Sequence, residues 1–342
     1  MRRICCIIWL ALLMALGLMP SSPVSAETLH YRVAIQQPSN QIDHSLGYFA
    51  LRVAPNTAQQ LTITITNQDT CAHRYLLAIN RATTNANGAI DYTNHANKPR
   101  AGLAADLQQM ATVPASVTVP AKTTQTVPIR LHTPPTHFAG LVLGGLQVQE
   151  VSTAAAASGQ GVQLHNQFAY VIGIALQEDA SYTALKPQLV LRGIKAQLHN
   201  DHNSITINLA NLKPNLIHQL QLAAIITKQG HAKPVLTSTK ANMTMAPNST
   251  FAYPLSTQNQ PLQAGHYRLQ LTASASGGKY QWHFTKAFTI TGASAAKLNQ
   301  AAVDLKHPAP PWGLYLMLDA GLGLLLIAIF LARGSLRHKR HH

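Results

Sequence analysis

Cysteine is nearly absent from this chain. Cys5 and Cys6 lie in an apolar run at the N-terminus, and beyond it only Cys71 remains. No intramolecular disulfide can therefore hold the rest of the chain together, although small secreted domains usually depend on such bonds. We expect Cys71 to be a buried small residue rather than a reactive thiol.

Acidic and aromatic residues are also scarce. The 342 residues include 11 Asp and Glu against 26 Lys and Arg, and only 6% are aromatic. No pair of carboxylates stands out as the couple that glycoside hydrolysis needs, and H-E-x-x-H, C-x-x-C, G-x-S-x-G and P-loop motifs are missing. The match of Ser276 and Lys279 to S-x-x-K falls in an expected hairpin turn. We expect a binding protein with no enzymatic activity, no cofactor and no metal; a polysaccharide-processing enzyme is the alternative.

One long apolar run stands near the end of the chain, at residues 312–332. It contains a single charged residue, Asp319, and it begins with Trp312, a residue type that favours the membrane interface. About 20 apolar residues span the hydrocarbon core of a bilayer, which predicts a transmembrane helix. A basic cytoplasmic tail at 333–342 follows, with Arg333, Arg337, Lys339 and Arg340. We expect Asp319 to lie toward the outer leaflet; a contact with another helix is the alternative.

The N-terminus has the pattern of a signal peptide at residues 1–26. Arg2 and Arg3 precede the apolar run, and an A-x-A-like site ends at Ala26. The mature chain is expected to cross the cell membrane once, with its N-terminus outside and its C-terminus in the cytoplasm. An exported region without disulfides indicates a bacterial surface.

The segment between these two ends, residues 27–311, is strongly basic. Without the basic residues of the two flanks and without Asp319, it holds 20 Lys and Arg against 10 Asp and Glu, a net charge of +10. This balance favours an anionic neighbour such as teichoic acid, anionic lipid or another acidic wall component. The alternative is that the charge only keeps the segment soluble. The predicted compartment and the even spread of the charges exclude nucleic acid.

The same segment has the period-two pattern of β-strands. Residues 61–66 alternate apolar side chains with Thr, and short apolar runs bounded by turn residues recur about every ten positions. We predict an all-β protein of two tandem immunoglobulin-like β-sandwiches at 27–183 and 184–292, a stalk at 293–311, and the single transmembrane helix. Gly144 and Gly145, inside an expected strand, predict a bulge, a close backbone approach or a need for small residues.

Four ordered segments of this region resemble the WxL-interacting protein family of Gram-positive bacteria. They are Gly47–Pro55 (GYFALRVAP), Thr83–Tyr92 (TTNANGAIDY), Phe138–Leu146 (FAGLVLGGL) and Phe168–Leu176 (FAYVIGIAL). Ala50 stands where the family commonly has Asp, and Asn56 stands where it commonly has Gly. The structural positions of these motifs are Tyr48, Phe49, Pro55, Gly88, Gly140, Gly144, Gly145 and Tyr170.

The resemblance implies a surface protein whose first domain binds peptidoglycan and whose second domain binds host matrix or serum proteins. It also implies WxL-domain proteins as partners. An adhesin that acts without binding the wall is a further alternative. Sugar sites usually stack aromatic rings, and Tyr92 is the ring that we expect to be exposed. We therefore name Tyr92 as the candidate for ligand binding, together with Asp91, Asn85 and Asn87 from the same turn.

Overall fold

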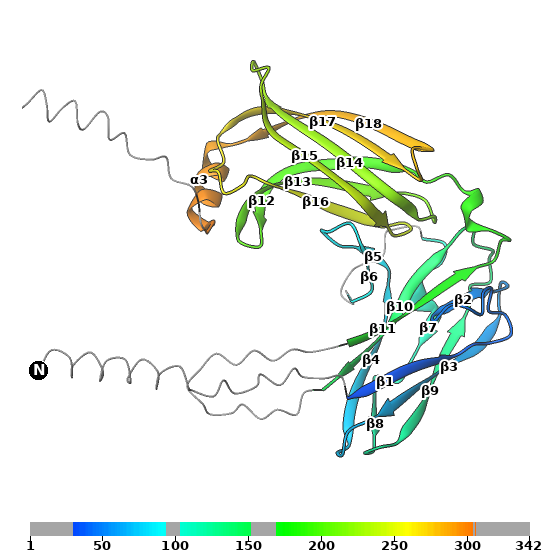
Figure 1. The fold of residues 1–342 in the computed structure, drawn as a ribbon. Helices are drawn as coiled ribbons and strands as arrows, with labels where there is room; N and C mark the ends of the chain where they lie inside the picture. The colour runs from blue at the N-terminus through cyan, green and yellow to red at the C-terminus, as the bar shows by residue number, and fades with distance from the viewer. Residues whose placement is uncertain (1–29, 94–102, 152–168, 304, 306–342) are drawn as a thin grey trace, which may run out of the picture. The chain divides into compact units, whose positions relative to one another are not determined.

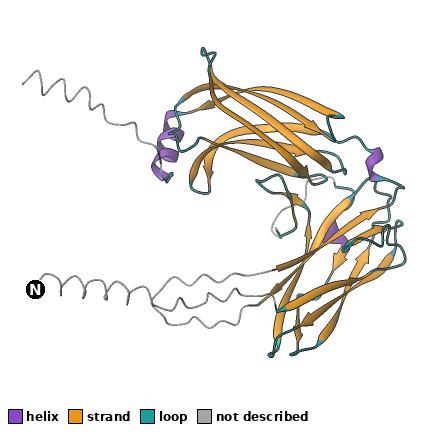
Figure 2. Cartoon of the chain, in the orientation of Figure 1, coloured by secondary structure: helices purple, strands orange, loops and turns teal. Residues whose placement is uncertain are grey.

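A computed structural model describes residues 30–93, 103–151, 169–303 and 305. These residues form two compact units, and each has a hydrophobic core of its own. Unit 1 comprises the described residues up to Arg81 and those of Tyr92–Ala180, whereas unit 2 comprises Ala82–Asp91 and the described residues from Ser181 onward. Strands make up most of both units, and helices are short (Figure 2).

Unit 1 is a β-sandwich of two sheets (Figure 1). Its four-stranded sheet has the order β1 (Tyr31–Gln36), β3 (Ala58–Asn67), β9 (Thr124–His132) and β7 (Ala111–Thr112). Its five-stranded sheet has the order β2 (Phe49–Arg52), β11 (Ala169–Gln177), β10 (Val142–Glu150), β4 (His73–Arg81) and β8 (Ser116–Val119). All pairs are antiparallel except β2 with β11.

The alternation seen in the sequence forms the core of unit 1. Leu61, Ile63 and Ile65 of β3 are at most 1% exposed, whereas the Thr residues between them are only partly covered. Successive side chains of a strand point to opposite faces, so one face of β3 packs inward. Pro128 lies in a part of β9 that pairs only with β3, so one side of the strand has no neighbour there, which is the kind of position where a sheet tolerates Pro. The short helix α2 (Leu107–Met110) begins at Asp106, whose side chain accepts a hydrogen bond from the backbone N–H of Gln108.

Unit 2 is a second sandwich. One sheet has the order β12 (Leu189–His199), β13 (His202–Asn211) and β16 (Thr250–Ser256). The other has the order β15 (Pro234–Met245), β14 (Ile217–Lys228), β17 (Gly265–Ala275) and β18 (Tyr280–Ile290), and every pair is antiparallel. A 3-10 turn, η1 (Tyr182–Ala184), precedes the first strand of this unit.

The hairpin of β5 (Thr83–Thr84) and β6 (Ile90–Asp91) also belongs to unit 2. These residues lie inside the first expected sandwich by sequence, but the structure groups them with the second. The all-β class is confirmed. The residues of both cores lie between positions 31 and 298. Every described strand also lies within residues 27–311.

The expected stalk is partly a folded element. Residues Gly292–Ala301 form the helix α3, which begins at Thr291, where the side chain accepts a hydrogen bond from the backbone N–H of Ser294. Ala295 is 5% exposed, and Leu298 packs against the core of unit 2. This Ala-rich stretch is therefore attached to unit 2 rather than being an extended connection.

The signal peptide at 1–26, the membrane span at 312–332 and the basic tail lie outside the described residues. Within the described ranges, no helix has the length and apolar character needed to cross a bilayer.

Candidate functional site

The β5–β6 hairpin carries three of the four residues expected to bind a ligand. Asn85 uses its side chain within the turn, because Oδ1 accepts hydrogen bonds from the backbone N–H groups of Asn87 (2.9 Å) and Ala89 (3.1 Å). Asp91 is partly covered, and Asn87 is exposed. Of the three, only Asn87 has an exposed side chain.

The other face of this hairpin is buried within unit 2. Thr84 Oγ1 lies 2.8 Å from Ser249 Oγ and accepts a hydrogen bond from the backbone N–H of Ala246 at 3.0 Å. Gly88 has φ +74°, and an added Cβ would lie 2.5 Å from Met243 Cγ. A residue with a positive φ and no space for a side chain has to be glycine. The residues of the family-like turn therefore attach the hairpin to unit 2.

Tyr92, the fourth candidate, is not the exposed ring that we expected. It is partly buried, and its Cβ and Cγ would lie 3.1 Å from a Cβ added at Gly145. Burial, followed by the nearby Tyr48, raises the pKa of Tyr92 to about 12. A phenol in this environment stays neutral, and much of its ring is unavailable for stacking on a sugar.

The two glycines of β10 mark close packing rather than a bulge. The register of β10 with both neighbours runs without a shift. A Cβ at Gly144 would lie 2.4 Å from the backbone oxygen of Asn80 and from Leu107 Cδ2, and a Cβ at Gly145 would meet Tyr92. Gly144 therefore has no space for a side chain, whereas a side chain at Gly145 would require its neighbours to shift by a few tenths of an ångström.

The remaining family-like positions are also structural. Phe49 is fully buried, and the ring of Tyr170 lies 5.1 Å from that of Tyr31. Tyr48 is 40% exposed, and its ring lies over the strand at Gly173. Pro55 is exposed, Gly140 has φ +83°, and Asn56 has φ +52°. Asn tolerates this left-handed conformation better than most residues, which explains how it can replace the family's Gly.

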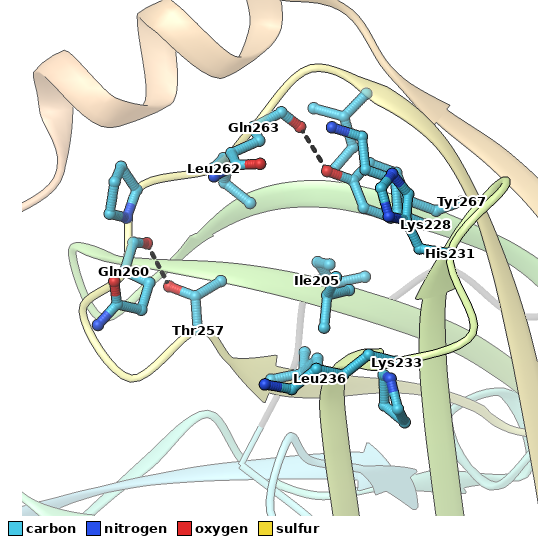
Figure 3. A pocket seen from close by; sticks show the side chains of 14 residues that line it. Ile205, Lys228, His231, Lys233, Leu236, Thr257, Gln260, Leu262, Gln263 and Tyr267 are labelled. Carbon is cyan, nitrogen blue, oxygen red and sulfur yellow. Dashed lines mark hydrogen bonds between the residues drawn. The ribbon is translucent and has the colours of Figure 1, made fainter.

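Unit 2 contains a pocket of about 550 Å³ that the sequence did not reveal (Figure 3). Ile205, Leu236, Leu262 and Ile290 form its apolar wall. Other lining residues lie in the connections β14–β15 and β16–β17. Two hydrogen bonds shape these walls: Tyr267 Oη donates to the backbone oxygen of Gln263 at 2.9 Å, and Thr257 Oγ1 donates to that of Gln260 at 2.8 Å.

The polar part of this pocket is basic. Lys228, His231 and Lys233 line it, and the lining contains no Asp or Glu. Lys228 ends β14, and His231 and Lys233 lie in the β14–β15 connection; Figure 3 shows the three side chains beside the apolar residues. An apolar wall next to cationic groups suits a ligand that has an apolar body and an anionic group. None of the four ligand-binding candidates lines this pocket.

Cys71 is exposed, so the expectation that it would be buried is wrong. It lies in the β3–β4 turn beside Asp69 and His73, and the possible ligand atoms of the three residues all lie within 4.8 Å of one another. Partial loss of water around the sulfur and the nearby Asp69 carboxylate raise the pKa of the Cys71 thiol, which disfavours a free thiolate. The local signal was D-x-C-x-H: three possible metal ligands at alternating positions.

Ser276 and Lys279 form the turn between β17 and β18. Ser276 has φ +52°, and the ammonium group of Lys279 lies 5.5 Å from the centre of the Tyr280 ring. The S-x-x-K match therefore lies in a hairpin turn, as the sequence predicted. Trp282, on β18, is partly buried, packs against the core of unit 2 and stacks on Tyr280, with the ring centres 6.2 Å apart.

Comparison with solved structures returns bacterial chaperones among its matches, with little sequence identity. The Pseudomonas aeruginosa CupB2 chaperone is 14% identical, with a TM-score of 0.28, and the match covers 67% of this chain and 92% of that one. A Salmonella enterica SafA pilin in complex with the SafB chaperone is 10% identical, with a TM-score of 0.31, and the match covers 77% of this chain and 99% of that one. Curated protein sequences gave no significant match.

Two family models match the chain in order. Residues 31–150 match the WxL Interacting Protein peptidoglycan binding domain, and residues 159–300 match the WxL Interacting Protein host binding domain. Together the two matches cover most of the chain, and they agree with the resemblance carried by the four motifs. The chain belongs to the WxL-interacting protein family and carries both of its binding domains.

Proposed function

We propose that this protein is a membrane-tethered binding protein of the cell surface that attaches to peptidoglycan and presents a second domain to host proteins. The observation that carries the proposal is the presence of both family domains, in this order, on one chain. A WxL-domain protein bound to the wall is the proposed partner.

Charge supports the assignment of a wall ligand. Residues 27–311 carry a net charge of +10, and wall polymers such as teichoic acid are anionic. Electrostatic attraction of this kind speeds encounter and weakens with salt. The proposed membrane attachment rests on the sequence of residues 312–332 and of the basic tail, and the proposed immunoglobulin-like topology rests on the two described sandwiches.

The basic pocket of unit 2 gives the second domain a concrete candidate surface. A peptide or glycan with a carboxylate or sulfate beside an apolar group would pair with Lys228 and Lys233 and cover Leu236 and Leu262. The pocket lies in the part of the chain that matches the host binding domain.

The test uses intact residues 27–311, because cutting between the two matched segments would separate the β5–β6 hairpin from Met243 and Ser249. We expect this fragment to sediment with purified peptidoglycan, less strongly as salt rises, and to co-purify with a WxL-domain protein. Absence of sedimentation at both low and moderate salt would contradict wall binding. Turnover of labelled wall fragments would contradict a purely binding role.

The pocket is tested separately with matched charge variants. Lys228→Glu with Lys233→Glu should abolish binding to whichever matrix or serum protein the fragment captures, and should leave peptidoglycan sedimentation nearly unchanged. Lys213→Glu with Lys279→Glu changes the charge equally at exposed positions outside the pocket. If both pairs of substitutions weaken host binding equally, the pocket is not the binding site.

A further inference from the structure

The β3–β4 turn of unit 1 brings three possible metal ligands together. His73 Nε2 lies 2.8 Å from Asp69 Oδ2 and 3.2 Å from Cys71 Sγ, and Cys71 Sγ lies 3.5 Å from Asp69 Oδ2. Imidazole nitrogen, thiolate sulfur and carboxylate oxygen are the ligands that zinc binds in proteins. The three atoms thus form one triangle of mixed donors, and this cluster takes no part in the binding functions proposed above.

The turn is held in this shape by a buried side chain. Asn67 is 1% exposed, its Oδ1 accepts a hydrogen bond from the backbone N–H of Asp69 at 2.9 Å, and its Nδ2 donates to the backbone oxygen of Cys71 at 2.8 Å. Asn67 Nδ2 also donates to the backbone oxygen of Val119 on β8 at 3.0 Å. The backbone that carries two of the three ligands is therefore fixed before any metal binds.

Glu150, at the end of β10, occupies the other side of the imidazole. Its Oε1 lies 2.6 Å from His73 Nδ1, but the contact lies outside hydrogen-bond geometry, so Nδ1 has no hydrogen bond among the described residues. A His that binds metal through Nε2 carries its proton on Nδ1 and usually donates it to a carboxylate or a carbonyl. A small rotation of the ring would make Glu150 that acceptor.

A second buried polar group adjoins the cluster. Tyr75 is fully buried, its ring centre lies 6.5 Å from that of His73, and its hydroxyl has no hydrogen-bond partner in the described part of the chain. Buried hydroxyls are nearly always paired, so the unpaired hydroxyl of Tyr75, two positions from His73 on β4, calls for a polar partner of its own.

The separations fit a tetrahedral ion after small movements. Bond lengths of about 2.0–2.3 Å and tetrahedral angles place ligand atoms about 3.4–3.7 Å apart. The Sγ–Oδ2 distance of 3.5 Å already fits, whereas Nε2, now 2.8 Å from Oδ2 and 3.2 Å from Sγ, must move about 0.6 Å or more from Oδ2 and about 0.2–0.5 Å from Sγ. Cys71 is exposed, so its side chain has room to make this adjustment.

We propose that Asp69, Cys71 and His73 bind a divalent transition metal of the zinc class, and that Glu150 orients His73 as a positioning residue. Three protein ligands leave the fourth position to water or to a ligand from another molecule. On binding, the thiol proton passes to solvent, and the ring proton lies on Nδ1. The ion would connect the β3–β4 turn to β10 and would protect an exposed thiol from oxidation.

The test titrates reduced residues 27–311 with Co²⁺ and Zn²⁺, because this fragment holds both cores and excludes the tail residues His338, His341 and His342, which could bind metal themselves. We expect one Co²⁺ per chain, with a thiolate-to-cobalt absorption band that Zn²⁺ removes. Cys71→Ser should abolish that band, and Glu150→Gln should weaken metal affinity about 10–100-fold while the band of the loaded protein persists.

The matched control is His137→Ala. His137 is the other described His that contacts two carboxylates, with Nε2 3.0 Å from Asp179 Oδ1 and 3.7 Å from Glu178 Oε2. This variant should keep the stoichiometry, the band and the affinity. Far-UV circular dichroism of each variant establishes that it is folded, and Cys71→Ser changes one atom of an exposed side chain. Failure to take up one metal ion per chain, absence of the band in the wild type, or equal loss of affinity in His137→Ala would overturn the proposal.

Discussion

A methyl group added at Gly88 should destabilise unit 2, although Gly88 lies in the segment that matches the first domain. Its φ of +74° costs an alanine about 1–2 kcal/mol. The new Cβ would lie 2.5 Å from Met243 Cγ and Sδ, and Met243 is 1% exposed, so its side chain has little room to move. Overpacking of this kind costs about 1–3 kcal/mol, which gives a total of about 2–5 kcal/mol for Gly88→Ala.

Trp282 provides a specific probe of this effect. It is the single Trp of residues 27–311, and it packs against the core of unit 2. A change of 1 kcal/mol shifts the melting temperature of a unit of this size by about 2–4 °C, so thermal unfolding followed by Trp fluorescence should shift downward by about 4–20 °C.

Gly230→Ala separates the two causes of the loss. Gly230 has φ +80°, close to that of Gly88, and an added Cβ would meet nothing within 4 Å. It should therefore show only the backbone cost of about 1–2 kcal/mol. Equal shifts for the two variants would refute the packing of the hairpin on Met243. The same conclusion would follow if Gly88→Ala left the Trp282 transition unchanged.

Three further substitutions test other contacts. Thr84→Val removes the buried partner of Ser249 and should cost unit 2 about 1–3 kcal/mol in the same assay, whereas Thr84→Ser should retain most of the stability. Asp106→Asn removes the charge that pairs with Arg81 at 2.6 Å. The Asp106 side chain is only 4% exposed, so we expect unit 1 to lose about 3–5 kcal/mol of its free energy of unfolding, measured by calorimetry. The pKa of Tyr92 is raised from 10 to about 12, so the neutral phenol stabilises the folded state fully below pH 10. Up to about 3 kcal/mol of the free energy of unfolding is lost as the pH rises to 12. Tyr92→Phe should reduce that alkaline loss, and an unchanged pH profile would show that the phenol is not buried.

Local patterns predicted the strands well. The alternation at residues 61–66 lies within β3, because side chains that alternate between a core and solvent leave a period of two in the sequence. The helix α3 was missed, although Thr291 before an Ala-rich run is a helix start that could have been read.

Long-range contacts set the limit of these predictions. Nothing near Thr84 or Gly88 in the sequence shows that their partners are Ser249 and Met243. The same holds for Tyr92, whose ring is covered by the strand that carries Gly145. The D-x-C-x-H spacing was visible in the sequence, but its fourth member, Glu150, joins the group only through the pairing of β10 with β4.

The position of the β5–β6 hairpin in unit 2 has a consequence for the order in which the chain folds. The hydrogen bond between Thr84 and Ser249 joins residues 165 positions apart, so the hairpin leaves the ribosome long before its binding surface exists. Domains usually fold as units from the N-terminal end during synthesis. Here unit 1 can fold while residues 82–91 are still unpaired, and the hairpin can pack only after Ser249 and its neighbours have been synthesised. Contacts of such high sequence separation slow folding, so this step is expected to be the slowest in the maturation of the protein and the one most exposed to proteases.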